Sequence, residues 1–448
     1  MSFPRYAKYK PSGVGWLGDV PAHWDVRELR QLGRLMKGSG GSKEDIVDSG
    51  VPCVRYGDLY TTHSFFVETA RTCLTSERAA AYTPIKYGDI LFAASGEKLD
   101  EIGKAAVNLI LGEAVCGGDL ILLRPSASVW PRFMGYASDS APSALQKASM
   151  GRGTTVKHIY PDELRHLVLT LPPEVEQQVI AAFLDRETAK IDALVAEQER
   201  LIELLNEKRQ AVISHVVTKG LNPNAPMKDS GIEWLGKIPA HWSVPPVYAR
   251  YNQALGKMLD EGKMTGEHPT PYLRNVDVRW DRFNIEDLPV MDIRPDEAER
   301  FMVRKGDLLM VEGRELGRSA IWDGADHIVA FQKALHRLRP LDDTEHPRFF
   351  YYTMVFANGV GVFFADQSPN EIPHLTGEQL RQHRFPKPPI SEQISIVEAL
   401  DQRTRAIDAL TVECERATTL LQERRAALIS AAVTGQIDVR PESVRAAA

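Results

Sequence analysis

The stretch that decides the fold is Pro172–Thr218, which reads PPEVEQQVIAAFLDRETAKIDALVAEQERLIELLNEKRQAVISHVVT. It recurs as Pro388–Thr434, PPISEQISIVEALDQRTRAIDALTVECERATTLLQERRAALISAAVT, with no gap and about half of the positions identical. After the opening prolines neither copy contains proline or glycine, and Ala, Leu, Glu, Gln, Arg and Ile dominate both. These residues favour the helical state. Each copy therefore predicts one helix of roughly 65 Å at a rise of about 1.5 Å per residue.

Both predicted helices carry an apolar stripe with polar interruptions at alternating spacings of three and four residues. The stripe comprises Ile191, Leu194, Gln198, Leu201, Leu205, Lys208 and Val212 in the first helix, and Ile407, Leu410, Cys414, Ala417, Leu421, Arg424 and Leu428 in the second. This spacing is typical of a coiled coil. Each stripe could instead pack on its own domain, but two similar stripes in one chain favour pairing with each other. We expect an antiparallel pair, because a parallel pair needs a linker as long as a helix.

A shorter motif precedes each of the two variable regions, which span about residues 23–171 and 245–387. Ser12–Val26 reads SGVGWLGDVPAHWDV and Ser230–Val244 reads SGIEWLGKIPAHWSV. A weaker likeness pairs YGDIL at 87–91 with KGDLL at 305–309, LRP at 123–125 with LRP at 338–340, and PRF at 131–133 with PRF at 347–349. A duplication of this kind indicates one structural unit used twice.

The regions between the repeats contain short β-rich runs, such as Ile90–Phe92, Leu120–Leu123 and Leu308–Val311, divided by Gly, Asp and Pro turns. We therefore expect an α+β protein in which two α/β domains are joined by two long antiparallel helices that form a coiled coil, with a pseudo-twofold internal repeat. The expected parts are an N-terminal repeat motif at 1–22, a first domain at 23–171, a central helix at 172–219, a linker with the second motif at 220–244, a second domain at 245–387, a distal helix at 388–435 and a tail at 436–448.

Composition limits the function. The 448 residues carry a formal net charge of −6, so bulk positive charge does not hold this chain to nucleic acid. The four cysteines, Cys53, Cys73, Cys116 and Cys414, form no CxxC pair, which argues against a zinc knuckle or a disulfide framework. No apolar run reaches the roughly 20 residues of a membrane span, and the first residues lack the apolar core of a signal peptide. We expect a cytoplasmic protein that does not associate with membranes.

Motifs for catalysis are missing from the sequence. There is no GxxxxGK[ST] phosphate loop and no HExxH metal motif. The glycine-rich run Gly38–Gly41 lacks the strand-turn-helix setting of a dinucleotide site, so we interpret it as a loop. His23 and His241 both lie in PAHW and are interpreted as structural. The most strongly repeated positions lie in the scaffold. This favours a protein with two binding regions and argues against an enzyme.

The ordered set of motifs resembles the DNA-specificity subunit of type I restriction-modification systems. The likeness rests on the PP..EQ opening, the IDAL helix and the closing VTG of Val433–Gly435, on WLG..P.HW, on Val54–Leu59 and Leu273–Val278, and on the GD.L segments. It covers almost the whole chain. The loop Ser368–Ile372 does not keep the pattern of Gly151–Thr155, so roles in base contact do not transfer from one half to the other.

The resemblance implies a non-catalytic subunit with two target recognition domains, each reading half of a split target on double-stranded DNA, and with paired helices as a ruler. Two adenine methyltransferase subunits would dock on the helices and bring S-adenosylmethionine. Motor and nuclease subunits using ATP and magnesium would join for restriction. The acidic balance is compatible with this function if partner subunits neutralise much of the phosphate charge.

Candidate DNA contacts are cationic, amide, hydroxyl and tyrosine side chains on turns of the two variable regions, because their polar groups can meet the base edges in the major groove. They are Arg55, Tyr56, Tyr60, Thr61, Thr62, Arg152, Thr154, Thr155 and Lys157 in the first half, and Arg274, Asn275, Arg279, Arg314, Arg318, Gln367, Ser368 and Asn370 in the second. For Arg55 and Arg274, a structural salt bridge to Asp58 or Asp277 is an equal alternative.

Two other functions are compatible with parts of the sequence. A coiled-coil adaptor could carry two α/β domains that bind protein ligands, since nothing in the helices distinguishes the two kinds of spacer. A self-contained restriction enzyme would need nuclease, methyltransferase and nucleotide motifs that the chain lacks.

Overall fold

A computed structural model describes residues 3–41, 45–99, 101–126, 128–153, 156–260, 262, 264–313, 315–324, 328–364 and 374–441. Contacts divide the chain into unit 1, residues 1–199 with 416–448, and unit 2, residues 200–415. Each unit therefore contains one variable region, the beginning of its own long helix and the end of the other long helix.

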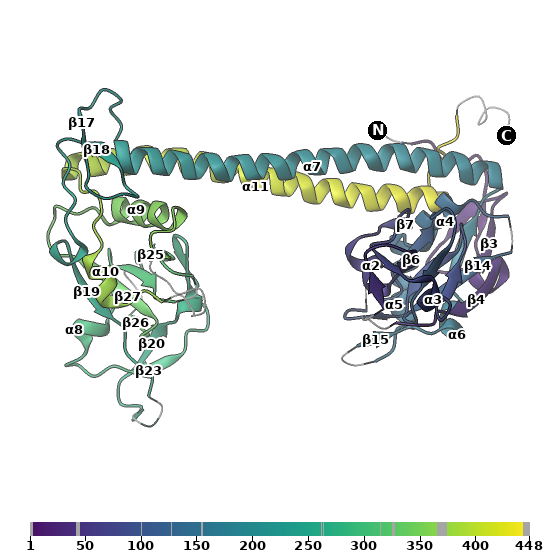
Figure 1. Cartoon of the computed structure of the whole chain (residues 1–448), viewed down its shortest axis with the longest axis horizontal. Coiled ribbons are helices and arrows are strands. Elements are labelled where there is room, and N and C mark those ends of the chain that lie inside the picture. Colours follow the sequence, from purple (N-terminus) through teal and green to yellow (C-terminus); the bar gives the residue numbers. More distant parts are fainter. Residues whose placement is uncertain are drawn as a thin grey trace. The chain divides into compact units, whose positions relative to one another are not determined.

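The two long helices are α7, Glu174–Lys219, and α11, Ile390–Val433, which confirms the predicted pair of long helices. Both begin directly after a Pro-Pro pair, where proline needs no helical N–H partner. The Gln177 side-chain amide donates to the carbonyl oxygen of Pro172 at 2.8 Å, and Gln393 donates to Pro388 at the same distance. In both units, segments of α7 and α11 run side by side (Figure 1).

The helices pair in antiparallel fashion. In unit 1 the Asp192 carboxylate accepts from Arg425 Nε at 2.7 Å, and in unit 2 the Arg209 Nε donates to Asp408 at 3.1 Å. As the α7 partner moves toward the C-terminus, the α11 partner moves toward the N-terminus. The apolar part of the pairing in unit 2 is a cluster of Leu205, Ile407 and Cys414, with Ile202 packed against it.

Three of the predicted helix-pairing positions are wrong. Leu194, Leu201 and Leu410 are 46%, 42% and 55% exposed. Val195, Ile202 and Thr411, one residue further along, are partly buried instead. Spacings of three and of four residues both fit a helical stripe, and the side that faces the partner is fixed only by tertiary packing. Of the other positions, Ile191, Leu205 and Ile407 are buried, and Val212, Leu421 and Leu428 are partly buried.

Unit 1 is built on two five-stranded sheets. The strand order of the first sheet is β4 (Gly33–Lys37), β14 (Leu120–Pro125), β10 (Ile90–Ala93), β12 (Ala105–Asn108) and β7 (Phe65–Val67). The strand order of the second sheet is β5 (Ile46–Val47), β8 (Thr72–Leu74), β6 (Val51–Val54), β13 (Ala114–Cys116) and β9 (Thr83–Ile85). All neighbours are antiparallel except β12 with β7 and β13 with β6. The short helices are α1 (Leu29–Leu32), α2 (Tyr56–Thr61), α3 (Ser76–Ala79), α4 (Pro131–Ser138), α5 (Ala141–Met150) and α6 (Pro161–Leu164).

Unit 2 repeats this plan with shorter sheets. Its four-stranded sheet has the order β19 (Tyr251–Leu255), β27 (Leu335–Pro340), β24 (Leu308–Val311), β25 (Ser319–Ile321), and its three-stranded sheet β23 (Val290–Asp292), β20 (Pro269–Leu273), β26 (Ala330–Phe331). A hairpin joins β21 (Val278–Arg279) to β22 (Arg282–Phe283). The helices are η1 (Val247–Ala249), η3 (Asn275–Asp277), α8 (Ala298–Phe301), α9 (Pro347–Gly359) and α10 (Gly377–Gln382).

Small two-stranded sheets complete both units. They are β1 (Tyr9–Pro11) with β2 (Asp19–Pro21), β3 (Asp25–Glu28) with β16 (Val168–Leu171), β11 (Ser95–Gly96) with β15 (Lys157–His158), and β17 (Met227–Asp229) with β18 (Lys237–Pro239). The repeated motifs that precede the variable regions therefore form matching hairpins, β1 with β2 in unit 1 and β17 with β18 in unit 2.

The ends of the long helices are part of the domain cores. In unit 1 the start of α7, around Ile180, and the end of α11, around Ile429, pack with the fully buried Trp24. In unit 2 the end of α7, around Val216, and the start of α11 pack with Trp242. The last stripe residue of each helix, Val212 in α7 and Leu428 in α11, also packs on a domain core, but on that of the other half of the chain. The alternative in which each stripe packs on its own domain therefore does not hold.

The two PAHW motifs fix the beginning of each long helix. His23 Nε2 lies 2.7 Å from the Glu176 carboxylate, and His241 Nε2 lies 2.7 Å from Glu392. Both acids belong to the first turn of a helix, where a negative charge is favourable. Each motif therefore connects a variable region to the first turn of its own long helix.

Candidate nucleic-acid interface

A cluster of three side chains joins each variable region to its long helix. In unit 1, Arg132 Nη1 lies 3.3 Å from the Asp185 carboxylate and Tyr136 donates to the same oxygen at 2.8 Å. Burial raises the pKa of Tyr136 well above its usual value, so the hydroxyl keeps its proton. The cluster holds α4 against α7.

Unit 2 repeats this cluster with the equivalent residues. Arg348 Nε donates to Asp401 at 3.0 Å, and Tyr352 donates to the same carboxylate oxygen at 2.5 Å. Burial raises the pKa of Tyr352 to about 12. The recurrence shows that the repeated sequence encodes the attachment of each variable region, and that any difference in binding must come from the rest of its surface.

The GD.L segments serve the scaffold of both units as well. Arg124 Nη2 contacts the Asp89 carboxylate at 2.7 Å, and Arg339 Nη2 contacts Asp307 at 2.7 Å. Both acids are almost fully buried, and both arginines are among the residues that repeat. The repeated chemistry therefore belongs to folding and not to ligand binding.

In unit 1, the described candidates gather around α2 and the small sheet of β11 and β15. The Tyr60 hydroxyl donates to the carbonyl oxygen of Ser95 at 2.9 Å, and Ser95 Oγ lies 3.0 Å from His158 Nδ1. Burial raises the pKa of Tyr60 to about 12. Tyr60 thus ties α2 to β11, and His158 ties β11 to the loop that holds Arg152, since these two residues form a β-bridge.

The other candidates of α2 differ in how free they are to meet a ligand. Tyr56 is 42% exposed, and its ring packs edge-on against Tyr60 with centroids 6.5 Å apart. The Thr61 hydroxyl donates to the carbonyl oxygen of Gly57 at 3.0 Å and lies 3.3 Å from the Thr62 hydroxyl. Arg55 precedes the helix, and its backbone N–H donates to the Asp58 carboxylate at 2.9 Å. Tyr56 is therefore the most accessible large side chain of this helix.

The glycine-flanked loop of unit 1 and the adjoining strand β15 carry two cations. The Arg152 side chain is 71% exposed and contacts the Glu163 carboxylate at 2.9 Å. Lys157 Nζ donates to the carbonyl oxygen of Gly153 at 2.6 Å. Thr154 and Thr155, which we also expect to contact DNA, lie outside the described residues.

In unit 2, most described candidates surround η3. Arg274 makes two hydrogen bonds to the Asp277 carboxylate, at 2.8 and 2.9 Å, so the alternative of a structural salt bridge holds for this residue. Arg318 is buried, donates to the carbonyl oxygen of Asn275 at 2.8 Å and pairs with Glu315. Arg279, on β21, is exposed. The candidates Arg314, Gln367, Ser368 and Asn370 lie outside the described residues.

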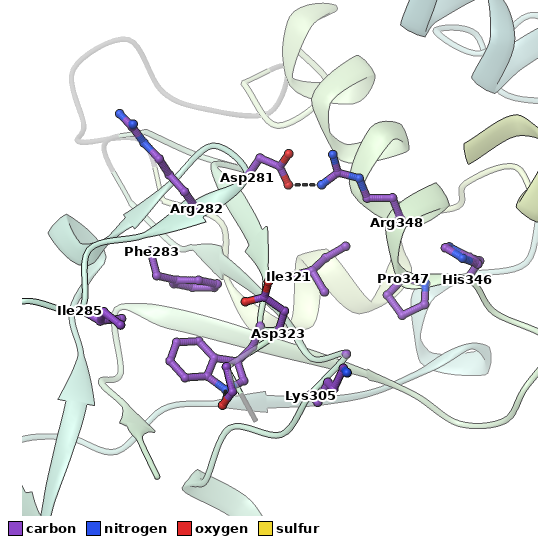
Figure 2. Close-up of a pocket in the computed structure, with 13 residues that line it drawn as sticks. Asp281, Arg282, Phe283, Ile285, Lys305, Ile321, Asp323, His346, Pro347 and Arg348 are labelled. Carbon is purple, nitrogen blue, oxygen red and sulfur yellow. Dashed lines mark hydrogen bonds and ion pairs between the residues drawn. The ribbon is translucent and has the colours of Figure 1, made fainter. Parts of the chain in front are cut away.

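A pocket of about 700 Å³ opens beside the β21–β22 hairpin of unit 2. Phe283 and Trp322 line it with ring centroids 5.1 Å apart. On the rim, Asp281 forms an ion pair with Arg348, and Arg282 extends away from both (Figure 2). Arg282, on β22, is not among the residues predicted from the sequence, because a lone arginine carries no motif.

Nothing in the described residues indicates a catalytic metal or a membrane span. They contain no group of three or more His, Cys, Asp or Glu side chains placed to hold a metal ion. Within the same residues, no helix combines the length and apolarity that crossing a lipid bilayer requires. The exposed candidates instead offer cations, hydroxyls and one aromatic ring, which are groups that bind nucleic acid.

Comparison with known proteins agrees with this interpretation. A family model described as a type I restriction modification DNA specificity domain matches residues 21–204. The putative type I restriction enzyme MjaX specificity subunit of Methanocaldococcus jannaschii is 25% identical and is aligned over 98% of this chain and 99% of its own length. The type I restriction enzyme EcoKI specificity subunit of Escherichia coli is 21% identical, over 94% of this chain and 90% of its own.

Solved structures show the same fold. A chain from a study of the assembly and conformational transition of the type I restriction-modification system superposes with a TM-score of 0.73 at 17% identity, covering 92% of this chain and 98% of that one. The HsdS subunit from Thermoanaerobacter tengcongensis superposes with a TM-score of 0.54, also at 17% identity, covering 93% and 98%.

Proposed function

The chain belongs to the family of type I restriction-modification DNA-specificity subunits, and we propose that it reads a bipartite DNA target with one recognition domain on each half-site. Specificity subunits are non-catalytic. In this proposal the first recognition domain spans residues 23–171 and the second 245–387. The observation that carries the proposal is that the attachment clusters recur residue for residue while the exposed candidate surfaces differ.

The difference between the surfaces is one of shape and of charge. Unit 1 offers the Tyr56 ring on a short helix and the exposed Arg152 on a loop. Unit 2 has a 3-10 turn and the β21–β22 hairpin in the corresponding stretch of sequence. Two unlike surfaces on one scaffold favour an asymmetric target in which the half-sites have different sequences.

We propose that α7 and α11 set the gap between the half-sites. Their length and their antiparallel pairing, with ion pairs at Asp192–Arg425 and Arg209–Asp408, support this function. Half-site spacing follows from protein geometry when the connection is stiff. Inserting one helical repeat between Glu197 and Leu205, with a matching repeat in α11, should lengthen the gap in the methylated sequence.

We also propose that two adenine methyltransferase subunits dock on the long helices. Two identical partners need two copies of the same binding surface. The exposed residues that repeat between the long helices offer such a surface. Leu194 and Leu410 are 46% and 55% exposed, and Leu204 and Leu420 are 44% and 55% exposed. In each pair the second leucine is the repeat equivalent of the first. The partners would bring S-adenosylmethionine, and motor and nuclease subunits would bring ATP and magnesium.

Methylation mapping tests the function directly. Genomes of the host with and without this gene are sequenced for methylated adenine, and the proposal expects a split, asymmetric sequence that is modified only when the gene is present. Exchanging residues 23–171 for the same region of another family member should change one half-site and leave the other. If deletion of the gene leaves every methylated sequence in place, or if the exchange changes both half-sites, the proposal is contradicted.

A further inference from the structure

The β21–β22 hairpin of unit 2 presents two arginines that face each other. Val278 pairs with Phe283 and Arg279 pairs with Arg282 in the antiparallel register. Since side chains alternate across a strand, Val278 and Phe283 pack into the domain core while the two arginines occupy the opposite face. Both arginines are exposed.

Like charges directly opposite each other destabilise an antiparallel pair. Neither guanidinium makes a hydrogen bond or ion pair with another residue in the part of the chain that the structure describes. The nearest acids in the sequence are already engaged, because Asp281 pairs with Arg348 and Asp277 with Arg274. Among the described residues, the hairpin therefore carries two positive charges at facing positions without an acidic partner for either.

The turn that carries these charges is firmly held. Asp281 has a φ of 61°, in the left-handed region, and its backbone N–H donates to the carbonyl oxygen of Ser319 at 3.1 Å. The Trp280 ring lies 6.3 Å from the Tyr351 ring at 67°. Figure 2 shows Asp281 directed toward Arg348 and Arg282 directed away from it. A turn held in this way loses little backbone entropy when a ligand binds.

We propose that Arg279 and Arg282 together bind one phosphate of the DNA backbone, which deepens the DNA-binding function proposed above and rests on it. A phosphodiester has two charged oxygens that converging guanidinium groups can share, whereas a guanine edge is satisfied by one arginine. The pair therefore positions unit 2 on its half-site and does not read a base. Unit 1 has helix α2 at the corresponding place, so this contact belongs to one half-site only.

The test uses the full chain assembled with its methyltransferase subunits and a duplex that carries the mapped target. Binding of wild type and of the double variant Arg279→Gln, Arg282→Gln is measured between about 50 and 200 mM salt. We expect the double variant to bind cognate and half-site-mutated duplexes more weakly by the same factor. The slope of log affinity against log salt should decrease by about 0.9, the value for one phosphate.

Two control variants accompany the measurement. Arg381→Gln removes an exposed arginine of α10 and should leave both affinity and slope unchanged. The double lysine variant, Arg279→Lys with Arg282→Lys, keeps the charge and should keep most of the slope. The thermal midpoint of the glutamine variant should equal or exceed that of wild type, because a repulsion is removed.

A duplex series with single uncharged methylphosphonates locates the contact. At one position, the methylphosphonate should weaken binding of the wild type by the same factor as the double substitution does on the unmodified duplex. The double variant itself should bind the modified and unmodified duplexes equally. An unchanged salt slope, a change in sequence preference, or loss of methyltransferase assembly with DNA contacts intact would overturn the phosphate contact. A wild-type complex with no preference for the mapped target would instead overturn the proposed function.

Discussion

Unit 1 and unit 2 join their recognition domains to the long helices with opposite chemistry at three matching positions. In unit 1 these positions are Leu32, which belongs to the hydrophobic core, and Val129 and Leu171, which are partly buried and pack against it. In unit 2 the same positions are Arg250 and Glu345, each with 1% of the side chain exposed, together with Lys387. Unit 1 uses an apolar contact at these positions, and unit 2 uses a triad of charged side chains.

The match between these positions rests on backbone hydrogen bonds. The carbonyl oxygen of Leu32 accepts from Ser126 N–H at 2.9 Å, and that of Arg250 accepts from Leu341 N–H at 3.0 Å. The backbone N–H groups of Trp130 and His346, which follow Val129 and Glu345, donate to the equivalent glutamines of α7 and α11. The backbone is therefore the same where the side chains differ.

The triad of unit 2 is fully paired. Arg250 donates to both Glu345 oxygens, at 2.8 and 2.6 Å, and Lys387 Nζ lies 2.7 Å from the same carboxylate. Burial alone would raise the pKa of Glu345, but Arg250 and Lys387 outweigh burial and hold the pKa below its usual value. Buried charges are tolerated only as such complete sets.

A second site shows the reverse exchange. In unit 1 the buried Lys147 donates to the carbonyl oxygen of Ser138 at 2.9 Å and lies 3.4 Å from Asp139. Lys147 lies against Gly103, and in unit 2 the ring of Phe363 lies against the equivalent Gly317. The scaffold therefore accepts either chemistry at a given place, provided that the whole set changes together.

The largest effect should follow from breaking the triad. Glu345→Val introduces the residue that unit 1 has, but leaves Arg250 buried without its partner. We expect a loss of about 3–5 kcal/mol in the free energy of unfolding, because an uncompensated buried charge remains. Denaturant unfolding followed by tryptophan fluorescence measures this loss. Val129→Ala in unit 1, the matched control, should cost much less, and a comparable loss in both variants would contradict the comparison.

Replacing the whole triad should restore stability. The variant Arg250→Leu, Glu345→Val, Lys387→Leu gives unit 2 the three residues of unit 1. We expect a free energy of unfolding within about 2 kcal/mol of wild type, since well-packed apolar residues often replace buried ion groups without loss, while the buried Tyr251 hydroxyl loses its Glu345 acceptor. The same unfolding experiment measures it. A triple variant as unstable as Glu345→Val alone would show that the three positions are not equivalent in the two units.

The sequence allowed the long helices and the duplication to be predicted, because both depend on local composition and on repeats. The helices expected at 172–219 and 388–435 span Glu174–Lys219 and Ile390–Val433. The β-rich runs at Leu120 and Leu308 are strands. Local signals of this kind do not depend on the rest of the fold.

What could not be predicted depends on contacts between distant residues. Arg250 and Glu345 are 95 positions apart, so no local pattern joins them. The face of α7 that meets α11 shifted by one position, from Leu201 to Ile202, because both residues are apolar and only the partner decides between them. The candidate DNA contacts were chosen by residue type, and Arg274 shows the weakness of this choice, since its guanidinium is engaged by Asp277.

The pH dependence of stability should differ at the second exchanged site. Burial lowers the pKa of Lys147, so the folded protein releases its proton at a lower pH than the unfolded chain does. Between the two pKa values the unfolded state binds more protons, and stability therefore rises with pH in that window, up to the unfolded value near 10.4. Lys147→Met should abolish this rise. Unfolding of wild type and variant from about pH 7 to pH 10 measures the difference, and parallel curves would contradict it.

The smallest effect on stability should come from Arg152. Its side chain is 71% exposed and makes one ion pair, to Glu163, so Arg152→Ala should change the free energy of unfolding by less than about 1 kcal/mol. If Arg152 contacts DNA, the same variant should bind severalfold more weakly to duplexes with an intact unit 1 half-site. It should bind as tightly as the wild type does when that half-site is mutated.

Arg274→Ala is the matched variant of unit 2. Its partner Asp277 is buried, so this change should cost more stability, because it strips two hydrogen bonds from a buried carboxylate. Titration of both complexes against duplexes mutated in either half-site distinguishes the two arginines, and an unchanged affinity of Arg152→Ala for every duplex would remove it from the interface.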